Sequence, residues 1–271
     1  VDPFLRCALK PAEELNAEEQ AFLLHYFFQC NDRMILRFPR YAELQEAWRA
    51  ADHNIDRARR LFHTQALRDL QVLSQLAWFD EEFFESDGDV RALVEKGRDF
   101  TLDEQALTGR KQTEILRRVL PAYKDFATRG QIELTTTPFY HPILPLLCDT
   151  NIYLHTHPNS PMPRRRFVHP EDAAEQLSRA AALHERLFGR RPVGVWPSEG
   201  SVSDAMVPLV AAAGFAWMAT DEQILGRTLS TGFWRDSQGQ VDHPESLYRA
   251  YQVSAGGAHV ACAFRDHVLS D

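Results

Sequence analysis

The chain has 271 residues, of which 44% are hydrophobic and 25% are charged, with a formal net charge of -8. These values are typical of a folded globular protein and exclude a disordered or fibrous chain. The acidic balance argues against a nucleic-acid partner, which usually requires a basic face. No apolar run is long enough to span a membrane, so no membrane partner is expected.

Cysteine spacing points away from a disulfide framework or a zinc knuckle. The four cysteines are far apart and form no CxxC pair: Cys7, Cys30, Cys148 and Cys262. Free, mostly buried thiols are therefore expected, which fits a cytoplasmic location. The first residues, Val1-Asp2-Pro3-Phe4, do not form a signal peptide and lack an initiator Met, so we expect a processed product or an excised fragment.

The first half of the chain is predicted to be helical. Three stretches carry apolar residues at helical spacing, at 12–29, 55–80 and 103–128. Asn16 is a possible helix start, and Pro121 is expected to kink or split the third stretch. Residues 38–41 and 86–89 are predicted to form turns.

After Gly130 the pattern changes to strands alternating with helices. Strands are predicted at 132–137, 193–196, 215–220 and 259–264, and helices at 170–188 and 201–213. This alternation is typical of parallel βαβ units. We found no internal repeat and no low-complexity tract. The run Arg164-Arg165-Arg166 is expected to be a solvated loop or a contact for substrate hydroxyls or an acidic partner.

Polar residues follow three of the predicted strands. Glu199 follows the first, Asp221-Glu222 the second and Arg265-Asp266-His267 the third. Because parallel strands deliver their carboxyl ends to one edge of a sheet, these groups are expected to meet there.

Glu199 is the strongest candidate for chemistry. The segment 194–201 places Trp196, with a flat face for a sugar ring, three residues before this carboxylate. Glu199 is either a nucleophile or proton carrier or an acid that a helix N-terminus favours.

Other candidates have structural alternatives that the sequence leaves open. Glu133 lies within an apolar strand and either faces a polar site or pairs with an arginine. His141 is a surface loop residue or a ligand contact, and Asp221 is a helix cap or a site residue. Asp266 and His267 form either a structural pair or part of the site.

His155-Thr156-His157 resembles a metal-ligand pair, although no matching carboxylate is evident.

GxSxG, HExxH, P-loop and GxGxxG signatures are missing from the sequence. Carboxylates and aromatic residues without a cofactor loop are typical of sugar chemistry, in which glycosidases use two acids.

Several long segments resemble glycoside hydrolase family 57, and the resemblance covers nearly the whole chain. They are Gly130–Leu134, Tyr140–Leu147, Trp196–Ser203, Thr220–Glu222, Phe264–Asp271, Asp32–Ile35 and Phe38–Tyr41. The last four of these segments look like the bacterial α-amylase/amylopullulanase-like branch of that family.

The resemblance implies a (β/α)7-type barrel and a retaining mechanism on α-glucans, without a metal or organic cofactor. Glu199 would be the nucleophile, and Trp196 would line a sugar subsite. The pocket would also contain Glu133 and His141, and Asp221, Asp266 and His267 are expected to bind substrate. Residues 1–129 would be a mainly helical segment and 130–271 the barrel units of one catalytic domain.

Two departures from the family pattern shape these expectations. No His-Gln-Pro motif is present, and the family's general acid/base, an Asp on a later strand, is expected beyond residue 271. We therefore expect part of a barrel that is inactive alone.

Two rival hypotheses remain open. One is a carbohydrate-binding or regulatory domain on the same scaffold, and the other a metal-dependent deacetylase or α-mannosidase-like enzyme using His155, His157 and Asp266. Linkage preference, hydrolysis versus transfer, and the oligomeric state are not specified by the sequence.

Overall fold

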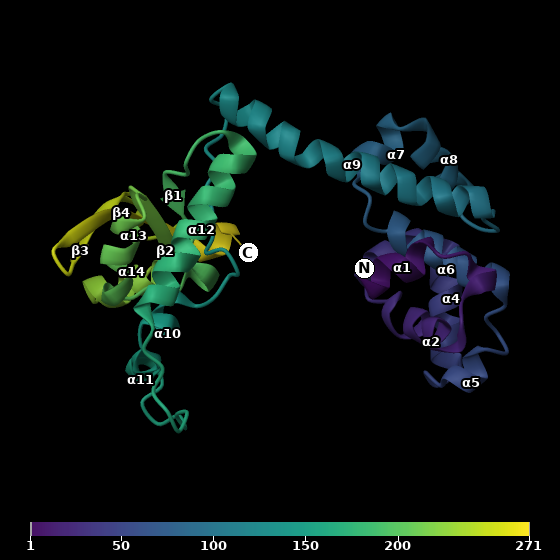
Figure 1. Cartoon of the computed structure of the whole chain (residues 1–271), viewed down its shortest axis with the longest axis horizontal. Coiled ribbons are helices and arrows are strands. Elements are labelled where there is room, and N and C mark those ends of the chain that lie inside the picture. Colours follow the sequence, from purple (N-terminus) through teal and green to yellow (C-terminus); the bar gives the residue numbers. More distant parts are fainter. Residues whose placement is uncertain (1, 271) are drawn as a thin grey trace. The chain divides into compact units, whose positions relative to one another are not determined.

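The structure is a computed structural model that describes residues 2–270 (Figure 1). The chain forms two compact units, one up to Val119 and the other from Leu120. The division falls within helix α9 (Leu102–Thr128), which continues through Pro121. Because proline has no N–H, α9 lacks one backbone hydrogen bond at this point. Among residues 2–270, no helix is both long and apolar enough to cross a membrane.

The first unit packs short helices around α6 (Thr64–Leu76), most of whose residues are buried. Its carboxylate Asp69 is fully buried and is balanced by Arg40, whose Nε lies 3.0 Å away, and by the N–H of Phe100. The surrounding helices are α1 (Pro3–Leu9), α2 (Ala17–Tyr26), α3 (Asp32–Arg37), α4 (Pro39–Ala50), α5 (Ile55–Ala58), α7 (Glu81–Ser86) and α8 (Gly88–Lys96).

Local signals decide where these helices break. The predicted helix 12–29 is split into a 3-10 turn (Ala12–Glu14) and α2, because Asn16 caps α2 in a capping box with Glu19. The predicted helix 55–80 separates into α5 and α6. The expected turn at 38–41 is wrong, since Pro39 begins α4, a position that suits its fixed φ.

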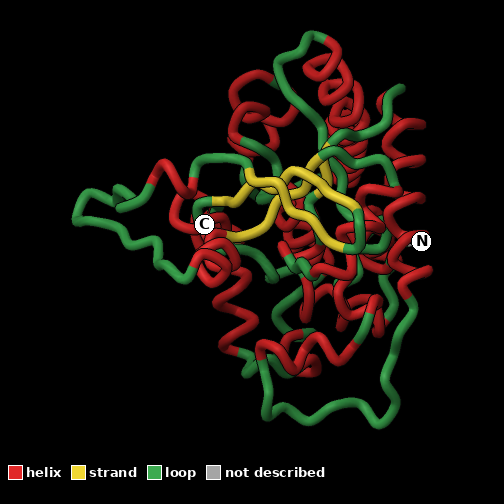
Figure 2. The backbone as a smooth tube through the Cα atoms, turned by 90° about the vertical axis from the view of Figure 1, so that its left-hand side faces the viewer, coloured by secondary structure: helices red, strands yellow, loops and turns green. Residues whose placement is uncertain are grey.

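The second unit contains a four-stranded sheet in the order β1-β2-β4-β3 (Figure 2, yellow). Strands β1 (Gly194–Val195), β2 (Trp217–Asp221) and β4 (Ala258–Arg265) are parallel. Strand β3 (Tyr251–Ala255) is antiparallel to β4, and the two are joined at Gly256-Gly257, both with positive φ. Such a tight hairpin turn requires residues that tolerate left-handed backbone.

Helices cover the sheet and bury its apolar residues. They are α10 (Leu144–Cys148), α12 (Pro170–Phe188), α13 (Val207–Ala212), α14 (Glu222–Leu229) and α15 (Pro244–Leu247). The unit also contains α11 (Tyr153–Thr156) and α16 (His267–Ser270), whose own residues are not buried. Val195, Met218 and Cys262, one from each parallel strand, pack together with Leu177 of α12 and Val210 of α13. Cys7, Cys148 and Cys262 are buried and free, as expected, and Cys30 is half-buried.

Two predicted elements of this unit need correction. The strand expected at 132–137 is reduced to a single parallel bridge between Thr136 and Val195. The helix expected from Ser201 begins only at Val207, after a 3-10 turn (Asp204–Met206). A helix from Ser201 would place Pro208 in its interior, where the ring clashes with the preceding turn. The other strands and the helix 170–188 are confirmed, whereas β3 was not predicted.

Candidate active site at the carboxyl edge of the sheet

The polar groups that follow the parallel strands do meet at one edge of the sheet. The strand register pairs Asp221 with Arg265, so β2 and β4 end side by side, and β1 ends three residues earlier, where Val195 pairs with Met218. The segments that carry Glu199 and His267 leave from this edge. The predicted arrangement of polar groups after the strands is therefore present.

Glu199 lies in a 3-10 turn (Ser198–Gly200) and not in the first turn of a helix. Its backbone is left-handed, with φ 56° and ψ 23°, which is uncommon for a residue other than glycine. Its side chain is 74% exposed, and among residues 2–270 its ion-pair partner is His141, whose Nε2 lies 3.1 Å from its Oε1. The carboxylate is thus open to solvent and held by one histidine.

His141 also has left-handed backbone, with φ 58°. Its second ring nitrogen, Nδ1, lies 3.5 Å from the hydroxyl of Thr137. Two neighbouring residues with strained backbone that bond to each other are typical of a functional site, because the surrounding structure must stabilise both.

Trp196 forms one wall near Glu199. Its half-buried ring lies against Gly200, where an added Cβ would approach the ring to 3.2 Å. The carbonyl of Gly200 accepts a hydrogen bond of 2.5 Å from the buried hydroxyl of Thr220 on β2. The guanidinium carbon of Arg265 lies 5.7 Å from the centre of the Trp196 ring, within the range of a cation–π contact.

Asp221 connects the ends of β2 and β4. Its carboxylate caps α14 by accepting from the N–H of Gln223, and it also accepts from Nε of Arg265 at 3.0 Å. Nδ1 of His267 lies 3.6 Å from the same carboxylate. Asp221 is therefore a helix cap that also contacts Arg265 and His267 at this edge.

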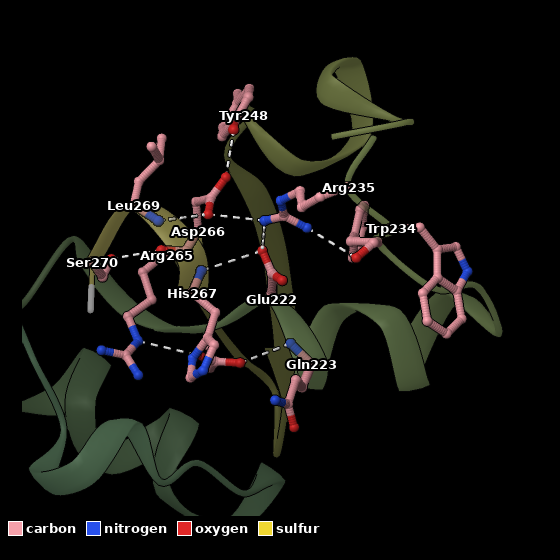
Figure 3. Close-up of polar contacts among 12 residues, drawn as sticks. Glu222, Gln223, Trp234, Arg235, Tyr248, Arg265, Asp266, His267, Leu269 and Ser270 are labelled. Carbon is pink, nitrogen blue, oxygen red and sulfur yellow. Dashed lines mark hydrogen bonds and ion pairs between the residues drawn. The ribbon is translucent and has the colours of Figure 1, made fainter. Parts of the chain in front are cut away.

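Behind this edge lies an ionic cluster in which half-buried Arg235 and the hydroxyl of exposed Tyr248 contact the buried carboxylates of Glu222 and Asp266 (Figure 3). Arg235 bonds to Glu222 at 2.5 Å and to Asp266 at 2.8 Å, while the hydroxyl of Tyr248 donates to Asp266 at 2.5 Å. Burial alone would raise the pKa of Asp266, but hydrogen bonds from Tyr248, the N–H of Leu269 and Arg235 lower it to about 2.

The cluster fixes the position of the segment after β4. Asp266 is only 7% exposed, and both of its carboxylate oxygens are occupied. The N–H of the adjacent His267 lies 3.3 Å from the carboxylate of Glu222. Sequence reasoning missed Arg235 and Tyr248, whose only signal is their position in the long segment between α14 and β3.

Glu133 lies elsewhere. Its Oε1 accepts from Nε1 of Trp217 at 2.9 Å, and Trp217 is the first residue of β2. Asp221, Asp266 and His267, by contrast, lie at or just after the last residues of β2 and β4. The structure therefore does not bring Glu133 to the edge where Glu199 lies.

The residues of the metal hypothesis are not brought together either. His157 stacks on Tyr153 at 4.4 Å, next to α11, which lies away from the strands (Figure 1). Asp266 is bonded to Arg235 and Tyr248. Within residues 2–270, no group of three or more His, Cys, Asp or Glu side chains is arranged to hold a metal ion.

The family model for glycosyl hydrolase family 57 matches residues 19–271, and the chain belongs to this family. A chain of this family is expected to form a (β/α)7-type barrel. Residues 2–270 form many helices and, in the second unit, a mixed four-stranded sheet, which is consistent with an incomplete barrel. A comparison with curated proteins gave no match.

Several solved structures are similar to the chain. One is the 4-α-glucanotransferase of Thermococcus litoralis, at 21% identity over 56% of this chain and 18% of that protein, with a TM-score of 0.39. The α-amylase AmyC of Thermotoga maritima is 13% identical over 95% of this chain and 43% of that protein, with a TM-score of 0.42. A family 57-type branching enzyme of Pyrococcus horikoshii is 16% identical over 74% of this chain and 32% of that protein, with a TM-score of 0.40. The chain thus spans less than half the length of each of these proteins.

Proposed function

We propose that this chain carries the nucleophile side of the active site of a retaining enzyme that hydrolyses or transfers α-glucans. The observation that carries the proposal is the exposure, backbone conformation and histidine contact of Glu199. This carboxylate is exposed at the carboxyl edge of the sheet, has strained backbone and bonds to His141. Membership of glycosyl hydrolase family 57 supports the reaction class.

In the proposed reaction, a carboxylate oxygen of Glu199 attacks the anomeric carbon of a glucose unit, and the bond to the leaving oxygen breaks. A general acid protonates that oxygen, and water or an acceptor sugar then displaces Glu199 from the covalent intermediate. A proton on Nε2 of His141 would hold the attacking carboxylate in place. We assign the general acid to no residue of this chain.

The remaining edge residues would shape the sugar site. The ring of Trp196 presents an apolar face, and Arg265 and His267 present polar groups that Asp221 positions. Sugars have both an apolar C–H face and hydroxyl groups, so this mixture suits them. The amylase-like bacterial branch and the cytoplasmic location stay predictions.

The test is the substitution Glu199→Gln in the full-length protein, assayed on amylose-type oligosaccharides. We expect kcat to fall by at least about 10³-fold, because an amide cannot act as the nucleophile. Glu175→Gln, which alters an exposed carboxylate paired with Arg179 on α12, is the matched control. Unchanged activity of the Glu199 variant would refute the assignment. Glucan binding without turnover in the unsubstituted protein would favour the carbohydrate-binding alternative.

A further inference from the structure

A small hairpin carries an exposed tryptophan beside the ionic cluster. Arg235 pairs with Val241 in an antiparallel bridge. The N–H of Trp234 donates to the carboxylate of Asp242 at 3.1 Å, and the N–H of Asp242 donates back to the carbonyl of Trp234 at 3.0 Å. The backbone at Trp234 is therefore fixed by hydrogen bonds on both sides.

Two inward side chains attach this hairpin to the body of the second unit. Arg235 bonds to Glu222 and Asp266, as described above. Val241 is buried with Leu225 of α14 and Leu247 of α15 in a small apolar cluster. Side chains alternate between the two faces of an extended strand, so anchoring Arg235 turns the preceding residue outward.

Trp234 is that outward residue, and it is 73% exposed. Figure 3 shows its ring pointing away from the ionic cluster. The ring lies close to Gly232, where an added Cβ would come within 2.8 Å of its Nε1. An exposed tryptophan ring on an anchored hairpin offers an apolar face together with the Nε1–H donor, a combination that is enriched at binding surfaces.

A hollow of about 400 Å³ lies next to this ring. Besides Trp234, its exposed polar lining residues are Gln223, Arg227 and Thr231. Gln223 is in the first turn of α14, directly after Asp221 and Glu222, so the hollow adjoins the carboxyl edge of the sheet. The lining combines an aromatic face with amide, guanidinium and hydroxyl groups.

We propose that Trp234 is a sugar-stacking residue of an additional subsite that holds a more distant glucose unit of the α-glucan chain. This inference rests on the proposed function. The ring would contact the C–H face of a glucose unit, while Gln223, Arg227 and Thr231 exchange hydrogen bonds with its hydroxyl groups. Of the ionic cluster, Glu222 also lines the hollow, whereas Arg235 points away from Trp234.

The test compares Trp234→Ala and Trp234→Phe with the unsubstituted full-length protein. Binding of maltoheptaose and of maltotriose is measured by calorimetry, with KM for both substrates as a second readout. Trp78→Ala is the matched control, because Trp78 is similarly exposed, at 63%, but belongs to the first unit. Thermal unfolding of each variant checks that the fold is retained.

We expect Trp234→Ala to weaken maltoheptaose binding about 3- to 10-fold, the range expected for one aromatic contact. Maltotriose binding should change less, Trp234→Phe should retain most of the affinity, and Trp78→Ala should have no effect. Equal maltoheptaose affinity for the Trp234→Ala variant and the unsubstituted protein would overturn the subsite. If the unsubstituted protein bound neither sugar, the proposed function and the subsite would both be wrong.

Discussion

His141 and Glu199 contact each other across two loops, with Nε2 and Oε1 3.1 Å apart, and both residues have left-handed backbone. Glutamate does not favour that conformation, which costs of order 1–3 kcal/mol when a side chain is present, whereas histidine adopts it more often. The neighbouring contacts of Gly200 with Trp196 and Thr220 help to fix the loop. The loop is therefore built to present this carboxylate at the expense of stability.

The strain at Glu199 predicts an unusual stability result. Glycine adopts left-handed backbone without penalty, so Glu199→Gly should be more stable than Glu199→Ala by about 1 kcal/mol, although glycine is normally the less stable of the two. Chemical unfolding of the two variants measures this difference. An alanine variant that is the more stable of the pair would show that the backbone at this position is not strained.

The His141 contact predicts a selective kinetic effect. Replacing His141 with Ala should lower kcat by about 10²-fold, because a donor to the reacting carboxylate is lost. KM should change little if this residue acts through Glu199 and does not bind the sugar directly. Steady-state kinetics on one α-glucan oligosaccharide separate the two parameters. A rise in KM at constant kcat would instead assign His141 to substrate binding.

Arg235 is predicted to be the key stabilising residue behind the site. Arg235→Met leaves the buried carboxylates of Glu222 and Asp266 without a counterion, which should lower the free energy of unfolding by about 3–5 kcal/mol. Arg179→Met is the control, since Arg179 pairs with Glu175 on the exposed face of α12 and should contribute less than about 1 kcal/mol. Equal effects of the two substitutions, measured by urea unfolding, would contradict this role.

The lowered pKa of Asp266 predicts a specific acid sensitivity. A carboxyl group whose pKa is about 2 in the folded state and about 4 when unfolded stabilises the fold above pH 4. That contribution should disappear as the pH falls from about 4 to about 2. The stability difference between the unsubstituted protein and Asp266→Asn should therefore shrink over this interval. A difference that stays constant from pH 6 to pH 2 would argue against the lowered pKa.

Elements with local signals at both ends could be predicted from the sequence. The helix α12 matches its predicted range because Pro170 begins it and Gly189, with φ 80°, ends it. The parallel strands and the edge at which Glu199, Asp221 and His267 gather follow from apolar runs that are each followed by polar residues. Residues 132–137 have strand-forming composition, but only Thr136 pairs, because strand formation depends on the partner.

The remaining parts of the site depend on contacts between residues that are far apart in the sequence. Arg235 bonds to carboxylates 13 and 31 residues away, and no periodicity marks such pairs. The left-handed backbone of Glu199 could not be predicted, because glutamate has no preference for it. Glu133 was placed near the site by resemblance, whereas its hydrogen bond to Trp217 holds it at the start of β2.

The most direct test of the central claim is to trap the covalent intermediate in the full-length protein. A 5-fluoro-α-glucosyl fluoride should react to form a glycosyl-enzyme that breaks down slowly, because the fluorine destabilises the transition state of its hydrolysis. Peptide mapping by mass spectrometry then locates the sugar. The anomeric fluoride leaves, so we predict one 5-fluoroglucosyl adduct on Glu199; an adduct on another carboxylate in an otherwise active protein would contradict the account.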